Sequence, residues 1–502
     1  ADPDCAMAYW GVAYATGPNY NLPWHLYDPK GRAMALAAAY EAAQEAKART
    51  GNITPVEKAL IEALDARYPQ RDPIDDLMPW NKDYTNSMRK VLADNPSDLD
   101  VQTVFVESIM NETPWKMWDL KTGGVAEDAG TAEAREILET SFRDVAESWD
   151  HPGLLHLYVH LMEMSPFPEL ALRAGDRLRE LVPESGHLIH MPTHIDVLCG
   201  NYRDVVVYNQ KATVADRKFL EREGAMNVYA MYRTHNYHFT IYGAMFLGQY
   251  TPAIEAAQEL IDRTPEELLM VPSPPMADFL EGYLSMKQHV LVRFGKWQEI
   301  VDQEMPDNQE LYCATSAMMR YAKSVAHSAM GNVEEAEKEK VLFLEAKAKV
   351  PESRRVHNNR VYDLLDIGEQ MLNGELEYRR NNYDIAFEHL RKAVELDDAL
   401  PYDEPWGWMQ PTRHALGALL MEQGHFTEAE AVYREDLGLD QTLSRACQHP
   451  GNLWSLHGLH ECLTQRGETV EALHIKQQLD QAIARAEVTV HASCYCRQQA
   501  AA

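Results

Sequence analysis

Most of the chain carries an amphipathic helical pattern. Over long windows, apolar residues recur at positions i, i+3, i+4 and i+7, and the windows are filled mainly by Ala, Leu, Glu, Met and Gln, which favour helices. Runs of β-branched residues that alternate with polar residues between turn signals are rare, so few strands are expected. The pattern predicts an all-α protein.

One kind of turn recurs between the predicted helices. A glycine is followed two residues later by an aromatic residue and five residues later by a small or aliphatic one. The clear copies are Gly200-Asn201-Tyr202 with Val205, Gly248-Gln249-Tyr250 with Ala253, Gly295-Lys296-Trp297 with Ile300, and Gly424-His425-Phe426 with Ala429; weaker copies are Gly331 with Ala336, Asn381 with Tyr383 and Ala386, and Gly467 with Ala472. This recurrence indicates a repeated helix–turn–helix unit.

The last residue of each copy marks the register of the repeat. The marks lie at residues 205, 253, 300, 336, 386, 429 and 472, and Ala171 precedes the first mark by 34 residues. A minimum period of 34 residues with insertions of variable length is typical of stacked helix pairs.

These units resemble the tetratricopeptide (TPR) family, and the segment from Asp384 to Leu396 matches its repeat well. The resemblance covers nearly the whole chain and implies a right-handed α-solenoid of TPR-like repeats. We expect a single array over residues 1–502. Its parts would be N-terminal repeats at 1–150 that begin within a repeat, His-rich central repeats at 151–260, C-terminal repeats at 261–485 and a tail at 486–502.

Further motifs resemble a group of long, His-rich microbial TPR-domain proteins. They are Ala6 to Gly11 with Gly17-Pro18-Asn19, Pro114-Trp115 followed by Trp118, Gly186 to His194, His235 to Phe239, and Arg293 to Trp297. The resemblance implies a helical solenoid and carries no assigned reaction, so the chemistry has to be inferred from the residues.

Charge and composition narrow the classes of function. With 47 Lys and Arg against 77 Asp and Glu, the formal net charge is −30. Because such a surface repels a polyanion, no nucleic-acid partner is expected. A run of about 18 apolar residues is lacking, which argues against a membrane partner. Seven scattered cysteines indicate a reducing, cytoplasmic setting for a soluble protein.

The 20 histidines are unevenly spread, and three segments carry the main candidates for chemistry. His156, His160 and Glu163 are spaced i, i+4 and i+7; His187, His190 and His194 are spaced i, i+3 and i+7; His235 and His238 are spaced i and i+3. Residues at these spacings share one face of a helix. Pro192 interrupts the second segment, so we expect a kink, or a regular helix that starts near Met191 and leaves His187 and His190 on a loop.

The repeat register joins the three segments into one pattern. If each mark is place twenty of its repeat, His187 and His235 occupy place two, His156, His190 and His238 place five, His160 and His194 place nine, and Glu163 place twelve. In the TPR proteins that this chain resembles, these places of the first helix line the concave groove. We therefore expect seven histidines and one carboxylate to face a common channel.

This set of side chains predicts a metal site. Neutral imidazoles without partners in a dry groove would cost about 1–3 kcal/mol each, and coordination satisfies them; an uncoordinated polar groove is the alternative. A nitrogen-rich set without thiolates suits copper, iron, zinc or nickel rather than calcium or magnesium. The predicted ligands of one or two ions are His156, His160, His187, His190, His194, His235 and His238.

The favoured function is that of a metal-dependent oxidoreductase, in which copper or iron acts on a small organic molecule. A zinc-dependent hydrolase or lyase is the first alternative, with Glu163 as general base on a metal-bound water. The second alternative is a non-catalytic scaffold that holds a protein or peptide partner in the groove. Peptide-binding grooves favour Asn, Lys and Arg at these places, so the histidines fit a scaffold poorly.

Two weaker signals lie near the C-terminus. A second histidine cluster runs from His449 to Cys462, and a superhelical turn could return His414, His457 or His460 toward the channel; we expect a hydrogen-bonding role for them. Cys494 and Cys496 are expected to be incidental thiols, with delivery of a soft metal ion as the alternative.

Overall fold

The computed structural model describes residues 2–497, which form two compact units. Unit 1 comprises residues up to 182 together with 272–274, and unit 2 comprises residues 183–271 together with those from 275 onward. The predicted all-α class is confirmed. The handedness of the repeats and the single array over residues 1–502 stay predictions, and positions 498–502 of the expected tail lie outside the described residues.

Unit 1 is built from α-helices and short 3-10 turns. They are α1 Ala6–Thr16, η1 Trp24–Leu26, α2 Pro29–Lys47, η2 Thr50–Asn52, α3 Pro55–Arg67, α4 Met78–Asp94, α5 Leu99–Met110, α6 Thr131–Asp144, η3 Ala146–Asp150, α7 Pro152–Glu163, η4 Pro168–Ala171 and α8 Leu172–Leu178. Several begin with Pro in the first turn, where no backbone N–H is needed. In α3, Thr54 and Glu57 form a reciprocal cap.

Unit 2 contains the remaining helices and one small hairpin. They are α9 Gly186–His190, α10 Thr193–Leu198, α11 Tyr202–Glu223, α12 Ala230–Leu247, α13 Tyr250–Asp262, α14 Glu266–Leu269, α15 Met276–Leu284, α16 Met286–Arg293, α17 Trp297–Asp302, α18 Cys313–Ala329, α19 Val333–Lys347, β1 Arg355–Val356, β2 Asn359–Arg360, α20 Val361–Arg379, α21 Tyr383–Asp398, α22 Thr412–Glu422, α23 Phe426–Leu437, η5 Arg445–Cys447, α24 Leu453–Arg466 and α25 Thr469–Ile483. The strands pair antiparallel, with Arg355 opposite Arg360 and Val356 opposite Asn359.

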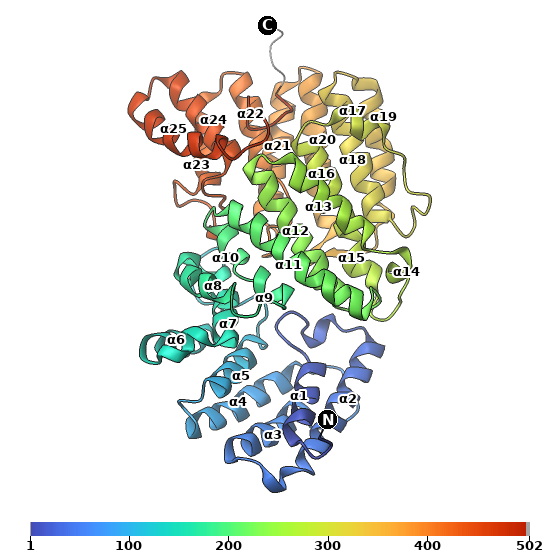
Figure 1. Cartoon of the computed structure of the whole chain (residues 1–502). Coiled ribbons are helices and arrows are strands. Elements are labelled where there is room, and N and C mark those ends of the chain that lie inside the picture. The colour runs from blue at the N-terminus through green and yellow to red at the C-terminus, as the bar shows by residue number, and fades with distance from the viewer. Residues whose placement is uncertain (1, 498–502) are drawn as a thin grey trace. The chain divides into compact units, whose positions relative to one another are not determined.

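The predicted repeats are confirmed as helix hairpins in unit 2. The pairs α10–α11, α12–α13, α16–α17, α18–α19, α20–α21, α22–α23 and α24–α25 pack together (Figure 1). Every register mark lies in the second helix of its pair and is buried: Val205, Ala253, Ile300, Ala336, Ala386, Ala429 and Ala472. The turn residues Gly200, Gly248, Gly295, Gly331, Asn381, Gly424 and Gly467 all have positive φ, which closes each helix pair.

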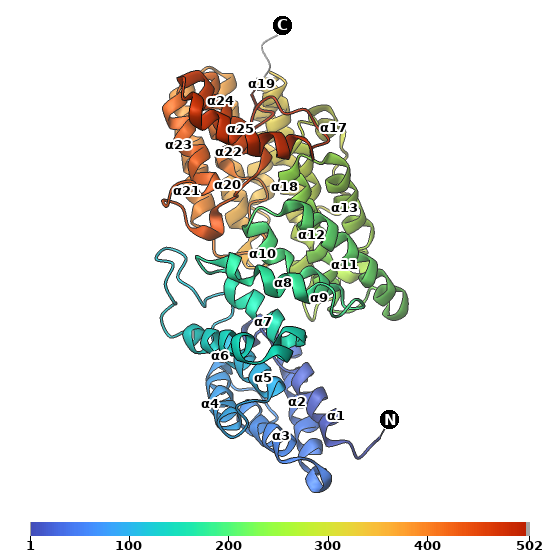
Figure 2. The ribbon, with the colours of Figure 1, turned by 60° about the vertical axis from the view of Figure 1, so that its left-hand side comes forward.

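Helix α12 holds a central place in unit 2. It packs against α15, α16 and α24 as well as its own partner α13, which lies beside it in Figure 2, and Trp454 of α24 donates a hydrogen bond to the carbonyl of Met245 at 2.8 Å. Nearly all of its residues from Arg233 to Leu247 are buried. Its polar side chains therefore face other protein groups rather than water, and each needs a partner.

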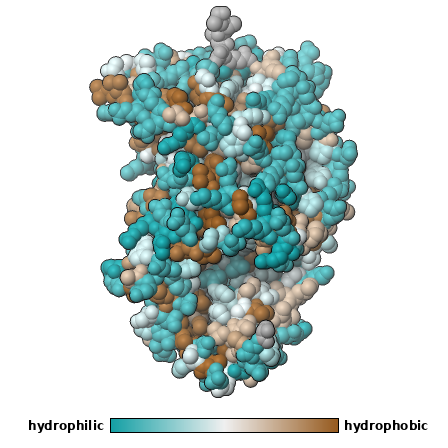
Figure 3. All heavy atoms as spheres, viewed as in Figure 1, coloured by the Kyte–Doolittle hydropathy of each residue, from teal (hydrophilic) through white to brown (hydrophobic). Residues whose placement is uncertain are grey.

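Hydrophilic residues cover most of the face shown in Figure 3. Among residues 2–497, no helix combines the length and apolar character that a membrane span requires. Cys494 and Cys496 are joined by a disulfide rather than being free thiols.

Candidate metal centre

The segment that carries three of the predicted ligands is broken at Pro192. Helix α9 ends at His190, and α10 begins at Thr193, so the predicted kink is confirmed. The alternative that placed His187 and His190 on a loop is wrong, because both lie in α9, whose N-terminus is capped by the hydroxyl of Ser185. The break turns α10 so that the side chains of the two short helices meet.

His190, His194 and His235 come together in unit 2. One ring nitrogen of each lies within 4.8 Å of those of the other two. The ring of His235, on α12, has its centroid 4.8 Å from that of His190 and 5.5 Å from that of His194. Three imidazoles from three helices thus converge on one point, as the repeat register predicted for this part of the chain.

The orientation of the His190 ring is fixed by Asn209 of α11. The Nδ2 group of Asn209 donates hydrogen bonds to the carbonyl of Val205 and the hydroxyl of Thr193. Its Oδ1 therefore faces Nδ1 of His190, at 2.6 Å, and accepts the proton there. In the neutral ring the lone pair is then on Nε2, the nitrogen that points toward His194.

The ring of His194 presents the same nitrogen. Its Nδ1 lies 3.7 Å from Oε2 of Glu404, within ion-pair distance, and its Nε2 lies 2.8 Å from Nε2 of His190. At 3.7 Å the Glu404 carboxylate is too far for a hydrogen bond and leaves the tautomer of His194 open. With its proton on Nε2, His194 donates a hydrogen bond to Nε2 of His190; with its proton on Nδ1, the two Nε2 lone pairs face each other, as they would around a shared metal ion.

His235 and His238 differ in their surroundings. Burial and the neighbouring imidazoles hold the pKa of His235 well below its ordinary value, so the ring stays neutral. Nε2 of His238 lies 2.8 Å from Sδ of Met409, and burial lowers its pKa to about 3. The ring of His187 is centred 6.3 Å from that of His190. His187 and His238 therefore flank the three-imidazole group, and their role as ligands stays a prediction.

The loop between α21 and α22 supplies residues that the sequence did not single out. Glu404 faces His194, and the adjacent Asp403 pairs with Nδ1 of His357 at 2.5 Å. Although burial opposes it, the Asp403 carboxylate raises the pKa of His357. The available signal in the sequence was a pair of adjacent acidic residues, Asp403 and Glu404, in a Pro-rich loop.

The remaining predicted residues lie on α7 in unit 1. His156 and His160 have ring centroids 4.8 Å apart, and Nδ1 of His160 lies 2.9 Å from Oε1 of Glu163. All three thus share one helix face, as their spacing predicted. Glu163 is buried and contacts an imidazole, which makes it a group that orients His160; its role as a general base stays a prediction.

A pocket adjoins the three-imidazole group in unit 2. His194 and Glu404 form part of its wall, and four aromatic side chains form much of the rest: Phe239, Tyr242, Tyr402 and Trp406. The ring of Phe239 stacks on that of His194, with centroids 4.8 Å apart. The volume of the pocket is about 20 Å³, which is room for about one water molecule beside one of the candidate metal ligands.

Comparisons with known proteins add little. No protein-family model matches the chain, and no curated protein matches it. Among solved structures, a human IFIT1 dimer with m7Gppp-AAAA is similar over 96% of both chains, with 12% identity and a TM-score of 0.34. A monomeric mutant of IFIT1 with Gppp-AAAA gives 12% identity over 96% of this chain and 95% of the other, with a TM-score of 0.36. Likeness at this level supports no argument about function.

Proposed function

We propose that unit 2 binds a transition-metal ion through His190, His194 and His235. The observation that carries the proposal is the approach of two Nε2 atoms to 2.8 Å, while Asn209 accepts from the opposite nitrogen of His190 and the Glu404 carboxylate lies 3.7 Å from that of His194. The His190 ring then follows the arrangement in which an outer hydrogen-bond acceptor orients a metal-bound imidazole. A shared proton is the competing explanation, and it predicts no metal binding.

The geometry needs only a small adjustment to accept an ion. Two nitrogens bound tetrahedrally at about 2.1 Å lie about 3.4 Å apart, so the two Nε2 atoms, now 2.8 Å apart, would separate by about 0.6 Å. His235 supplies the third imidazole. Three protein ligands leave a position for a substrate or water, which is the pattern of catalytic rather than structural sites.

The ligand set favours two classes of reaction. Copper or iron is favoured, with oxidative chemistry on a small organic molecule. Zinc with three imidazoles is the close competitor, because it activates a bound water for hydrolysis. Three further proposals rest on the sequence pattern alone. They are that His156, His160 and Glu163 take part in the site, that a second ion binds, and that the chain is related to His-rich microbial TPR proteins.

Metal analysis of the purified full-length protein tests the proposal. After loading with Cu²⁺, Fe²⁺ or Zn²⁺ and removal of excess ion, about one ion per chain should remain bound. The His190→Ala, His194→Ala double variant should lose it. A matched variant, His474→Ala with His491→Ala, removes two exposed histidines and should keep it. Equal metal content in all three proteins, or none in the wild type, would reject the centre.

A scaffold role has one observation in its favour. The C-terminal segment packs against other parts of unit 2, where Arg293 donates to the carbonyl of Ser493 and Arg379 donates to the carbonyl of Cys496. Arginines that hold main-chain carbonyls are the kind of contact by which a groove binds an extended peptide. A labelled peptide of residues 487–497, added to a chain that ends at Ala486, should bind if the groove is a peptide site.

A further inference from the structure

The C-terminal segment of unit 2 is held against the repeats close to its disulfide. The carbonyl of Ser493 accepts a hydrogen bond from Arg293, and the carbonyl of Cys496 accepts one from Arg379. In the sequence, the disulfide between Cys494 and Cys496 adjoins both of these carbonyls. It therefore constrains the backbone that carries the two anchors.

Two side chains add to this attachment. Oγ of Ser493 donates to the carbonyl of His414 at 2.7 Å and accepts from the hydroxyl of Tyr433 at 2.6 Å. Arg497 donates two hydrogen bonds to the carboxylate of Glu461, both at 2.8 Å. All of these contacts come from residues 493–497, so the conformation of a few consecutive residues decides whether the segment stays in place.

A separate attachment lies nearer to α25. The backbone N–H groups of Glu487 and Val488 both donate to the carbonyl of Gly248, at 3.0 and 3.3 Å. Residues 489–492 connect this attachment to the anchors at 493–497. The end of the chain can therefore leave its place while α25 and the residues that follow it stay fixed.

One of the anchoring arginines is buried without a direct ion pair. Among the described residues, Arg293 donates to Nδ1 of His414 at 2.8 Å and to the carbonyl of Ser493, and it lies 3.8 Å over the ring of Trp454. Its Nε is buried without a hydrogen-bond partner there, and burial lowers the pKa of Arg293 to about 9. The docked segment thus keeps a cation out of water, which costs free energy.

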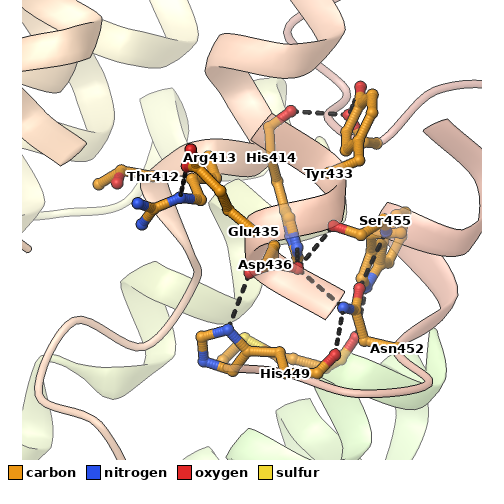
Figure 4. Close-up of polar contacts among 12 residues, drawn as sticks. Thr412, Arg413, His414, Tyr433, Glu435, Asp436, His449, Asn452 and Ser455 are labelled. Carbon is orange, nitrogen blue, oxygen red and sulfur yellow. Dashed lines mark hydrogen bonds and ion pairs between the residues drawn. The ribbon is translucent and has the colours of Figure 1, made fainter. Parts of the chain in front are cut away.

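The carboxylate of Asp436 is reached by Arg293 only through His414. Its Oδ2 accepts from Nε2 of His414 at 3.0 Å, Nδ2 of Asn452 at 2.8 Å and Oγ of Ser455 at 2.6 Å, and its Oδ1 accepts from Nδ1 of His449 at 2.8 Å (Figure 4). Although burial favours the neutral acid, the two imidazoles hold the pKa of Asp436 well below its usual range, so it is ionised. These contacts involve no atom of residues 489–497, so they remain when the segment leaves.

The disulfide lies where there is little spare room. Cys496 is 3% exposed, whereas Cys494 is half-buried. The cavity that both residues line has a volume of about 30 Å³, room for about one water molecule. Two separate thiols need more space than a bonded pair, so reduction requires neighbouring groups to move. The freed residues also regain conformational entropy that docking has to remove.

We propose that the disulfide between Cys494 and Cys496 is a redox lock, and that its reduction by a dithiol releases residues 489–497 and uncovers Arg293. A thiolate of the reductant attacks Sγ of Cys494, the more exposed sulfur, and Cys496 leaves as a thiolate that takes up a proton. The second thiol of the reductant then displaces Cys494, whose sulfur accepts the N–H of Cys496 at 3.1 Å. The products are two cysteine thiols and a cyclic disulfide of the reductant.

The rate of alkylation of individual thiols tests the lock in full-length protein. The protein is reduced with dithiothreitol, freed of reductant without oxygen and treated with iodoacetamide in the presence of a chelator, and each rate is compared with that of the same thiol in urea. Cys496 should react within about threefold of its rate in urea, as the exposed Cys5 does, while the buried Cys462 stays about a hundredfold slower.

Three outcomes would overturn the proposal. They are a reduced Cys496 that reacts as slowly as Cys462, a Cys462 that becomes as fast as Cys496, and free thiols at Cys494 and Cys496 before any reduction. The first means that the segment stays docked, the second that reduction opens the repeats, and the third that no lock forms. Because the chelator excludes metal, each of these is distinct from failure of the metal centre.

The variant Arg497→Gln separates release of the segment from a local opening of the disulfide ring. It removes the ion pair with Glu461, which only a docked segment can form. Reduction should become faster by up to about fivefold, as for other partly exposed pairs, while alkylation of Cys496 in the reduced chain stays unchanged. Arg485→Gln, at an exposed position before the anchors, should alter neither rate. If Arg497→Gln speeds alkylation in the reduced chain, the segment stays docked after reduction and the proposal fails.

Discussion

Oδ1 of Asn209 lies 2.6 Å from Nδ1 of His190 and fixes which nitrogen of that ring faces His194. Replacing Asn209 by Ala removes the acceptor and frees the ring to rotate or to change tautomer. Outer-shell partners of this kind typically affect metal affinity by about 10–100-fold. We therefore expect Asn209→Ala to weaken metal binding by that factor, as measured by competition with a chromogenic chelator.

The control for this change is Asn227→Ala. Asn227 is partly exposed, and its side chain donates to the carbonyl of Gly224, so its loss should leave metal affinity unchanged. If the two variants bind metal equally well, Asn209 has a purely structural role and the orientation of His190 does not limit binding.

A second prediction concerns the stability of unit 2. Asp436→Asn replaces an ionised acceptor of several buried hydrogen bonds by an amide whose NH₂ group faces donors. Breaking a buried charged network in this way costs about 3–5 kcal/mol. Urea denaturation should show that loss in the free energy of unfolding. Asp480→Asn, which affects only an exposed ion pair with Lys476, should cost less than about 1 kcal/mol.

The repeats could be predicted from sequence because the signal is local. A positive-φ turn residue and a small buried residue five positions later recur within a few residues of each other, as Gly248 and Ala253 do. Register then correctly placed His190, His194 and His235 near one another, because repeats stack in sequence order. His414 also makes the hydrogen bonds that were expected of it.

What the sequence did not predict depends on contacts between distant segments. Glu404 reaches His194 across about 200 residues, and Tyr242 meets His449 over a similar separation. Neither Glu404 nor His449 lies at a repeat position that is expected to line the groove. Asn209 lies on a second helix, away from the places expected to line the groove, so nothing in its local pattern distinguishes it from a packing residue.

A pH-dependent contribution to stability is expected from Asp397, which anchors the loop that carries Glu404. It accepts hydrogen bonds from Trp406 and Thr412, and burial, with Asp398 nearby, raises its pKa to about 6. A raised carboxyl pKa means that the folded state binds the proton more tightly than the unfolded state. Between about pH 4 and pH 6, stability should therefore fall as pH rises, by about 3 kcal/mol in total.

The variant Asp397→Asn cannot titrate, so its stability should lack this fall. Thermal unfolding of wild type and variant at matched pH values from 4 to 7 measures the difference, in which the other carboxyl groups cancel. Parallel pH profiles would show that Asp397 has an ordinary pKa in the folded protein.

The net charge of −30 predicts weak interaction with nucleic acid. Phosphate backbones require clustered cations, whose contribution falls as salt rises. We expect no saturable binding of a fluorescent single-stranded RNA at about 0.15 M salt in an anisotropy titration, where the Debye length is about 8 Å. Micromolar or tighter binding would contradict this expectation and would point to a local basic surface that the overall charge conceals.

The turn glycines give a matched pair for separating backbone strain from packing. Gly331 and Gly248 both have positive φ, 81° and 70°. A Cβ at Gly331 would meet open space, whereas a Cβ at Gly248 would lie 2.5 Å from Cδ2 of the buried Leu453 on α24. Gly331→Ala should cost about 1–2 kcal/mol from the left-handed backbone alone. Gly248→Ala should cost about 1–3 kcal/mol more, because Leu453 has to move within a packed core. Equal losses in urea denaturation would mean that α24 yields at this contact and that the two hairpins pack less tightly there than the structure indicates.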